Sequence, residues 1–216
     1  MCSKFTIYGE RCSGTTYLEE MMLNNFNISV TWNYGWKHFF GFQDFKGDEE
    51  ENDTLFICIV RDPVDWIESF YREQHHLIHT NNLNEFLTRK VISFTDNNMN
   101  KVVLKDINYT NGKLYKNLFE LRFYKNYYLL NILPKKVKNY ILIRYEDLSK
   151  SPIETMIDIK NKFNLNMKEN KIKNVKYYKK EKNKEYHKKK SNISKFEKYL
   201  IRKEFNIIQE RKLGYM

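Results

Sequence analysis

The sequence contains no alanine, few cysteines and no long apolar run. Its three cysteines, Cys2, Cys12 and Cys58, show neither metal-site spacing nor a pairing pattern, which favours a reducing, intracellular setting over a disulfide-stapled secreted scaffold. Nowhere do about 18 consecutive apolar residues occur, and the first residues form no apolar segment of signal-peptide length. We therefore expect a soluble, cytoplasmic protein without a transmembrane segment.

The composition bounds the fold and the partners. A length of 216 residues suits one domain spanning 1–216, and 41% hydrophobic with 16% aromatic residues can fill a sizeable core, despite a mean hydropathy of −0.72. The formal charge of +11 invites nucleic acid or a membrane as partner. However, abundant Lys, Asn, Ile and Tyr without Ala is what an AT-rich genome encodes. We therefore expect a polyanionic small ligand rather than nucleic acid, and oligomeric state stays open.

Apolar periodicity predicts alternating strands and helices. Short β-favouring runs at 4–8, 55–60 and 140–143 read as strands. Helical spacing follows at 13–26, from Pro63, at 115–133, from Ser151-Pro152 and at 194–212. Segments 31–54, 94–112 and the Lys-rich 168–190 read as loops. Strands alternating with helices indicate an α/β fold, a three-layer αβα arrangement around a central parallel sheet.

A glycine-containing turn joins the first predicted strand to the first helix, with the sequence Gly9-Glu10-Arg11-Cys12-Ser13-Gly14-Thr15-Thr16. Backbone N–H groups and the helix dipole favour an anion at such a junction. Both glycines match the Walker A pattern G-x-x-x-x-G-K-[ST], but Thr15 stands in the lysine position, which argues against an ordinary nucleoside triphosphatase. A purely structural alternative is a tight turn at Gly14 with Ser13 capping the helix.

A second motif lies where the next predicted strand ends. Arg61 follows the apolar run, Asp62 and Pro63 begin a helix as N-cap and first residue, and Ser69 falls two turns later. Arginine offers a bidentate fork and serine a hydroxyl to a phosphate. Because ligands of open α/β sheets bind outside the carboxyl ends of the strands, we expect both motifs at one site. Taken alone, this motif is also compatible with a capped helix whose arginine pairs with a surface acid.

Together the motifs resemble the sulfotransferases that use 3′-phosphoadenosine-5′-phosphosulfate (PAPS), and the G-E-R-x-S-G-T opening is similar to microbial and viral members. The resemblance implies a P-loop-NTPase-like fold, transfer of a sulfuryl group to an acceptor hydroxyl or amine, and no metal. It implies that the 5′-phosphosulfate is held by Arg11, Cys12, Ser13, Gly14, Thr15 and Thr16. It places the 3′-phosphate at Arg61 and Ser69. Many members carry a basic residue where this chain has Cys12.

Sulfuryl transfer needs a cation for the leaving oxygen and a base for the acceptor's proton. Arg11 in the turn and Lys37 in the loop after the first helix are the predicted cations. His38 is the predicted general base, since a neutral imidazole is available near physiological pH. Glu10 is a competing base or a partner of Arg11, and Lys37 could carry the charge without His38.

Further residues are assigned less directly. Arg122 and Lys125 are three positions apart on a predicted helix, and we expect a solvated face for them rather than a contact with cofactor or acceptor. His75 and His76 are expected to be structural or to face the acceptor, and Tyr145 to approach the adenosine. The run 187–190 lies where the family closes a basic loop. Loop aromatics that could stack on a glycan acceptor, or lie in the core, are Trp32, Tyr34 and Trp36.

Two other functions stay open. A P-loop-like kinase acting on a small molecule would share the fold, although Thr15 speaks against it. A catalytically inactive module that holds a nucleotide or polyanion is the other, supported by Cys12 in place of a basic residue. Preference for adenosine 3′,5′-bisphosphate over ATP, and consumption of PAPS, separate the three functions.

Overall fold

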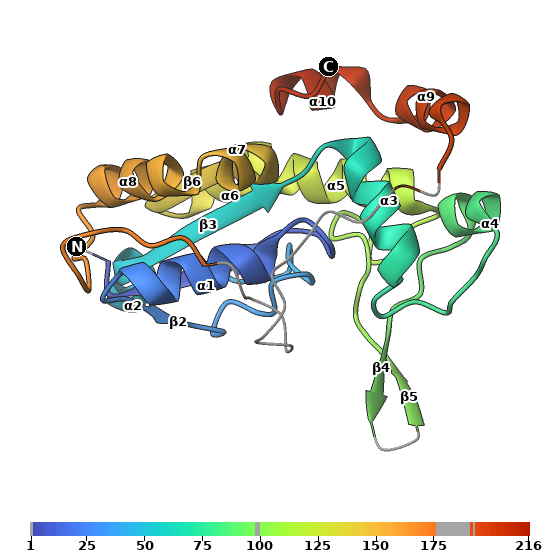
Figure 1. The fold of residues 1–216 in the computed structure, drawn as a ribbon. Coiled ribbons are helices and arrows are strands. Elements are labelled where there is room, and N and C mark those ends of the chain that lie inside the picture. The colour runs from blue at the N-terminus through green and yellow to red at the C-terminus, as the bar shows by residue number, and fades with distance from the viewer. Residues whose placement is uncertain (1, 98–99, 176–190, 192) are drawn as a thin grey trace.

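The structure, a computed structural model, describes residues 2–97, 100–175, 191 and 193–216 (Figure 1). Its central sheet consists of β1 (Lys4–Tyr8), β2 (Ser29–Val30), β3 (Thr54–Val60) and β6 (Asn139–Arg144). The strand order is β2-β1-β3-β6, and every pairing is parallel. The three predicted strands are therefore confirmed, and their carboxyl ends meet at one edge of the sheet.

Strand β3 shows why the sheet is covered on both faces, because all of its residues are buried. Leu55, Ile57 and Ile59 join a core with α1 (Thr15–Asn25) and α8 (Pro152–Phe163). Phe56, Cys58 and Val60 join another core with the π-helical turn η1 (Tyr128–Ile132) and α6 (Leu133–Lys136). Alternating side chains thus meet helices on opposite faces. The predicted three-layer α/β architecture with a central parallel sheet is confirmed (Figure 1).

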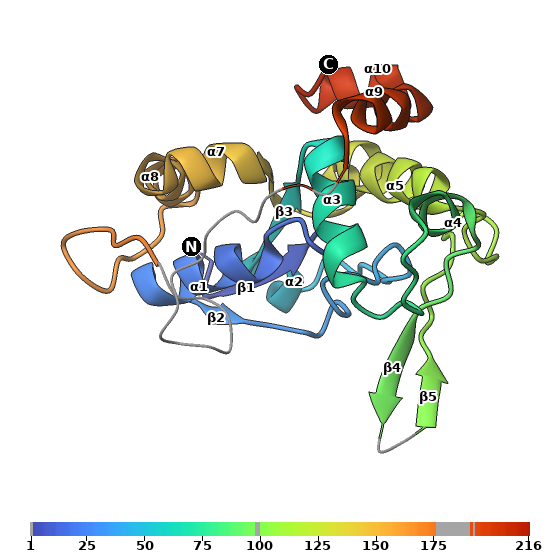
Figure 2. The same ribbon diagram turned by 45° about the vertical axis from the view of Figure 1, so that its right-hand side comes forward.

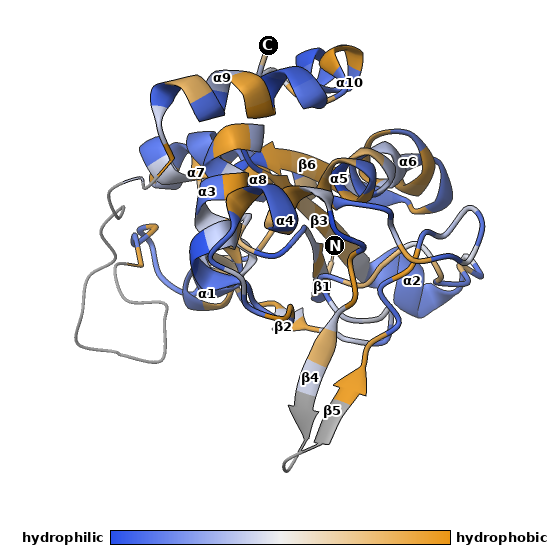
Figure 3. Cartoon of the chain, turned by 90° about the vertical axis from the view of Figure 1, so that its right-hand side faces the viewer, coloured by the Kyte–Doolittle hydropathy of each residue, from blue (hydrophilic) through white to orange (hydrophobic). Residues whose placement is uncertain are grey.

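The remaining helices are α2 (Glu49–Asp53), α3 (Pro63–Glu73), α4 (Leu83–Thr88), α5 (Leu118–Tyr127), α7 (Tyr145–Lys150), α9 (Lys195–Glu204) and α10 (Ile207–Lys212). A further core joins α3, α4, α5 and α9, and it is built on Trp66, Phe70, Phe86, Leu121 and Phe205. These helices gather at one end of the molecule (Figure 2). Apolar and polar residues alternate in bands along them (Figure 3). No helix within the described ranges is long and apolar enough to cross a membrane.

Local sequence signals explain where α3 begins. The Asp62 carboxylate accepts hydrogen bonds from the backbone N–H groups of Val64 and Asp65, and Pro63 occupies the first turn. The predicted cap is thus confirmed, and it orients the residues that follow Arg61. By contrast, α1 begins after Gly14, whose φ of 95° is left-handed, and no described side chain caps it. The structural alternative, in which Ser13 caps α1, is wrong, because the Ser13 hydroxyl donates to the Glu10 carbonyl.

Several predicted loops and helices differ from the structure. Segment 94–112, expected to be a loop, contains an antiparallel hairpin of β4 (Phe94–Asn97) and β5 (Asn100–Val103) that projects from the body (Figure 1). Segment 31–54 contains α2. The helix expected over 115–133 begins at Leu118 and continues through the π-helical turn to Lys136. The helix expected over 194–212 is interrupted, since Asn206 caps a new helix by accepting from the Gln209 N–H.

Candidate functional site

A pocket of about 150 Å³ lies where β1 and β3 end. Its lining contains Arg11, Cys12, Gly14, Thr15, Thr16, Tyr17, His38, Arg61, Ser69, Glu73, His75, His76 and Tyr145. The structure therefore brings both sequence motifs to one cavity, as expected from parallel strands. Ser13 and Lys37 do not line it but flank it. Typical small-molecule pockets enclose about 300–1,000 Å³, so this pocket is small for a site of that kind.

The glycine turn is held in a conformation that directs its backbone toward the pocket. The Ser13 N–H and hydroxyl both bond the Glu10 carbonyl, at 3.1 and 2.6 Å. Cys12 and Gly14 have left-handed φ angles of 63° and 95°. A Cβ at residue 14 would lie 2.4 Å from the Tyr145 ring, so the position requires glycine for space as well as for conformation. The uncapped first turn of α1 beside it suits an anion.

Arg61 is a buried cation whose charge the described part of the protein does not neutralise. Its side chain is only 5% exposed and lines the pocket. One guanidinium nitrogen donates to the Cys12 carbonyl at 2.9 Å, and the guanidinium carbon lies 4.6 Å from the centre of the Tyr145 ring. Its Nε is buried without a hydrogen-bond partner, and no carboxylate among the described residues pairs with it. The alternative interpretation, in which Arg61 pairs with a surface acid, is therefore wrong for the described residues.

Ser69 and Cys12 lie beside Arg61 in the pocket wall. The Ser69 hydroxyl accepts a weak hydrogen bond from Arg72 at 3.3 Å and interacts with the Cys12 thiol. Burial raises the pKa of that thiol to about 11, an effect that Ser69 and Arg61 only partly offset. Cys12 is therefore a neutral thiol near pH 7, and it contributes neither a cation nor a thiolate nucleophile.

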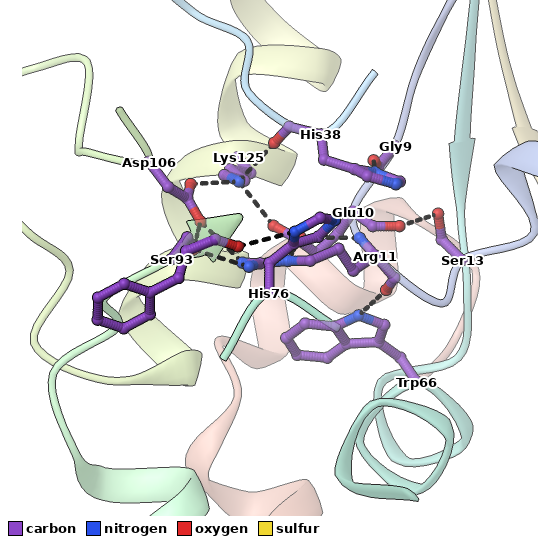
Figure 4. A network of polar contacts seen from close by, with 11 residues as sticks. Gly9, Glu10, Arg11, Ser13, His38, Trp66, His76, Ser93, Asp106 and Lys125 are labelled. Atoms are coloured by element: carbon purple, nitrogen blue, oxygen red, sulfur yellow. Dashed lines mark hydrogen bonds and ion pairs between the residues drawn. The ribbon is translucent and has the colours of Figure 1, made fainter. Parts of the chain in front are cut away.

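Arg11, in contrast, is fully engaged with protein acceptors (Figure 4). Its guanidinium donates to Glu10 at 2.9 Å, to the Ser93 hydroxyl at 2.8 Å and to Asp106 at 2.8 Å. Its carbonyl accepts from the Trp66 indole N–H at 2.8 Å. Arg11 is 1% exposed, and its predicted role as a cation for the leaving group competes with these bonds. In this structure it ties the glycine turn to the segment that carries the hairpin.

Lys125 completes this network from α5. Its ammonium lies 2.8 Å from both the Glu10 and Asp106 carboxylates and donates to the His38 carbonyl at 2.7 Å. Burial alone would raise the pKa values of the two acids, but Lys125 and Arg11 outweigh it and lower them, that of Asp106 to about 2. The charges of Arg11 and Lys125 thus balance those of Glu10 and Asp106 beside the pocket. Glu10 is therefore a structural partner of Arg11.

The solvated helix face expected for Arg122 and Lys125 is wrong, since they are 4% and 2% exposed. Arg122 makes a bidentate ion pair with Glu210, at 2.6 and 2.7 Å, and donates to the Arg61 carbonyl at 2.9 Å. Their three-residue spacing places both side chains on one face of α5. That face is buried because acidic side chains from distant segments pack against it. The pairing with Glu210 joins α5 to α10 and braces the end of β3.

His38 lines the pocket, and its ring is fixed by a short bond between Nδ1 and the Gly9 carbonyl, at 2.7 Å. Because a carbonyl only accepts, Nδ1 carries the hydrogen and Nε2 keeps a lone pair. Burial lowers the pKa of His38 to about 3, so the ring is neutral at physiological pH. The neighbouring Lys37 ammonium lies 3.1 Å from Glu19 and 3.4 Å from the Thr16 hydroxyl. Lys37 thus stands beside the first turn of α1.

The other predicted residues separate into three groups. His75, His76 and Tyr145 line the pocket. Trp32 and Trp36 are 42% and 38% exposed, whereas Tyr34 is in the core. Run 187–190 and most of segment 168–190 lie outside the described residues. Within the described ranges, no group of three or more His, Cys, Asp or Glu side chains could hold a metal ion.

Comparisons with known proteins find similarity only among solved structures. No known protein family and no curated protein matches the sequence. Six chains of solved structures match, among them mouse sulfotransferase SULT7A1 complexed with PAP, with a TM-score of 0.42 and 16% sequence identity. That match covers 75% of this chain, which spans 58% of the length of the mouse chain. A similarity of this degree carries no conclusion about activity, which is argued below from the pocket alone.

Proposed function

We propose that this chain binds PAPS in the pocket at the ends of β1 and β3 and transfers its sulfuryl group to an acceptor hydroxyl or amine. The observation that carries the proposal is Arg61. A buried guanidinium without a carboxylate partner is costly, so an anion from outside the protein completes the site. A second anion site, the uncapped first turn of α1, opens into the same pocket.

PAPS fits these two sites because it carries phosphate groups at both ends of its ribose. In the proposal, Gly14, Thr15 and Thr16 hold the 5′-phosphosulfate through backbone N–H groups and hydroxyls. Arg61 and Ser69 hold the 3′-phosphate, which ATP lacks. The Tyr145 ring, in contact with both Gly14 and Arg61, lies beside both groups of residues. The site would thereby select PAPS over ATP.

PAPS, when bound, supplies the sulfuryl group, and the chain's own residues position the acceptor and compensate charge. We assign the cation to Lys37, whose ammonium already contacts Thr16 in the first turn of α1. Arg11 would act indirectly, by holding the turn through Glu10, Ser93 and Asp106. His38, the residue predicted from the sequence to be the base, is proposed to contact the acceptor, because its Nε2 can accept a hydrogen bond from it.

The acceptor proposed here is a small molecule or a glycan. Trp36 is 38% exposed, and its ring centre lies 5.2 Å from that of His38. An exposed indole beside His38 offers a flat apolar surface on which a sugar face can stack. Tyr34 cannot share this role, since it is buried against Phe45 and Phe56.

Ligand discrimination tests the proposal. Adenosine 3′,5′-bisphosphate should raise the melting temperature of the chain more than equal concentrations of ATP or AMP, because binding to the native state stabilises it. Equal shifts would contradict the proposal, and a larger shift with ATP would indicate the kinase alternative. Labelled PAPS offered with a panel of sugars, amines and phenols then tests transfer. Binding without consumption of PAPS would indicate the inactive module.

A further inference from the structure

Two histidines from different segments line the pocket with the same hydrogen-bond arrangement. His38 Nδ1 lies 2.7 Å from the Gly9 carbonyl, and His76 Nδ1 lies 2.9 Å from the Phe94 carbonyl. In both rings the carbonyl fixes the hydrogen on Nδ1. Each neutral ring therefore keeps an unprotonated Nε2, the atom that can accept from a substrate. Both side chains are drawn in Figure 4.

Trp36 contacts both rings. Its ring centre is 5.2 Å from that of His38 and 5.1 Å from that of His76, with interplanar angles of 70° and 85°. Phe39 also packs against Trp36 and His76. The exposed indole and the two imidazoles are therefore neighbours, and a molecule that stacks on Trp36 lies near both histidines.

The backbone at His76 is held in an unusual conformation. Its φ of 63° is left-handed, a conformation that costs a residue other than glycine of order 1–3 kcal/mol and persists only where the surroundings impose it. The imposing contacts are reciprocal, since the Phe94 N–H donates to the His76 carbonyl at 2.8 Å while the His76 ring donates to the Phe94 carbonyl. The fold thus fixes this ring at the pocket wall.

We propose that His76 is a further catalytic residue of the transfer proposed above, on which this inference rests. Its Nε2 accepts the hydrogen bond of the attacking hydroxyl or amine and then its proton. The acceptor's O–H or N–H bond breaks and its electron pair forms the bond to sulfur. The sulfur–oxygen bond to the 5′-phosphate breaks, and its electron pair stays on the phosphate oxygen. His38 accepts a hydrogen bond from a second donor of the acceptor.

The difference in burial between the histidines supports assigning the acceptor's proton to His76 and only a hydrogen bond to His38. His38 is 8% exposed, and its pKa of about 3 makes it a weak proton acceptor, although it always accepts hydrogen bonds. His76 is only partly buried and open to the pocket, so a proton can pass from it to solvent. The arrangement fits an acceptor with two neighbouring donors, such as a vicinal diol or an amino alcohol of a sugar.

Matched asparagine variants test the role of His76. Asparagine keeps a side-chain N–H near the Nδ1 position, lacks Nε2 and tolerates positive φ. With labelled PAPS and glucosamine as probe acceptor, His76→Asn should lower kcat about 100-fold, as expected for loss of a general base, while the Kd for adenosine 3′,5′-bisphosphate stays unchanged. The control is His79→Asn, an exposed histidine outside the pocket lining, which should match the wild type.

Wild-type kcat in His76→Asn would overturn the inference and leave the proposed function intact. No transfer by the wild-type chain would instead contradict the proposed function, and this inference with it. A readout independent of turnover is the ¹⁵N spectrum of labelled histidine, in which the neutral forms of His38 and His76 should both carry their hydrogen on Nδ1. A neutral His76 ring with its hydrogen on Nε2 would overturn the inference whatever the activity.

Discussion

Arg11 and Arg61 are both buried beside the same pocket, yet their surroundings differ. Arg11 meets two carboxylates and a serine hydroxyl, whereas Arg61 meets one backbone carbonyl and the face of a tyrosine ring. Among the described residues, the charge of Arg11 is neutralised by protein and that of Arg61 is not. The comparison separates a cation that holds the turn from a cation that is available to a ligand.

The Arg11 side also connects the glycine turn to neighbouring segments of the chain. Glu10 follows β1, Ser93 and Asp106 flank the projecting hairpin, and Lys125 comes from α5. Their shared contacts fix the main chain under His38, because Lys125 donates to its carbonyl. The Arg61 side has fewer internal bonds, which is compatible with the proposed binding of an anionic ligand by Arg61.

Removing one carboxylate from the Arg11 side should have the largest effect. Asp106→Ala leaves Arg11 and Lys125 with less counter-charge in the interior, so the free energy of unfolding should fall by about 3–5 kcal/mol. Urea unfolding measures it. The control is Asp147→Ala, which breaks an exposed pair with Arg144 and should cost under about 1 kcal/mol. Equal losses of unfolding free energy in the two variants would contradict the structural role assigned to the buried ion pairs of Arg11.

The buried His38 on the same side gives a pH-dependent test. Its pKa is about 3 in the folded chain and about 6.5 when unfolded, so below pH 6.5 the unfolded state binds a proton that the folded state does not. The free energy of unfolding should therefore fall as pH is lowered, and from pH 7 to 4 this residue should contribute about 3 kcal/mol of the loss. His38→Asn should remove that part. An unchanged pH dependence in the variant would contradict the burial argument.

Two glycines, of which Gly14 lies on the Arg61 side, separate backbone strain from steric overlap. Gly14 and Gly112 both have positive φ, but only Gly14 faces a side chain, the Tyr145 ring. Gly112→Ala should cost about 1 kcal/mol through backbone strain, and Gly14→Ala about 1–2 kcal/mol more through displacement of Tyr145. Thermal unfolding measures both. Identical losses would mean that Tyr145 is not held against the turn.

Neutralising Arg61 should change stability least. Arg61→Gln loses a hydrogen bond to Cys12 but also removes a buried charge without a counter-charge, so the free energy of unfolding should change by less than about 1 kcal/mol. Arg11→Gln, the matched change on the other side, should cost about 3 kcal/mol or more. A large loss in Arg61→Gln would show that this arginine is structural as well.

The sequence predicts the sheet and the two motifs because their signals are local. An unbroken apolar run such as 55–60 can only be a strand or helix buried on all sides, and Asp62-Pro63 marks where the next helix begins. Both motifs then converge because parallel strands end at one edge. These features needed no knowledge of distant contacts.

The burial of Lys125 and Arg122 could not be predicted in the same way. The spacing of Arg122 and Lys125 on α5 does not reveal that Glu10, Asp106 and Glu210 lie next to these side chains. Glu210, for example, is 88 residues from Arg122 in the sequence. The sequence did not single out His76, the base proposed above, for a similar reason. Its ring is oriented by the Phe94 carbonyl, in a hairpin strand that the sequence suggested was loop.

The central claim is that Arg61 binds a 3′-phosphate, and a cycle of dissociation constants tests it most directly. Adenosine 3′,5′-bisphosphate and AMP differ by that phosphate alone, so calorimetric titration of both into the wild type and Arg61→Gln isolates the contact. The wild type should prefer the bisphosphate by about 10- to 100-fold, the range of a charge-assisted hydrogen bond, and Arg61→Gln should lose that preference. Equal affinities in the wild type, or an undiminished preference in Arg61→Gln, would contradict the claim.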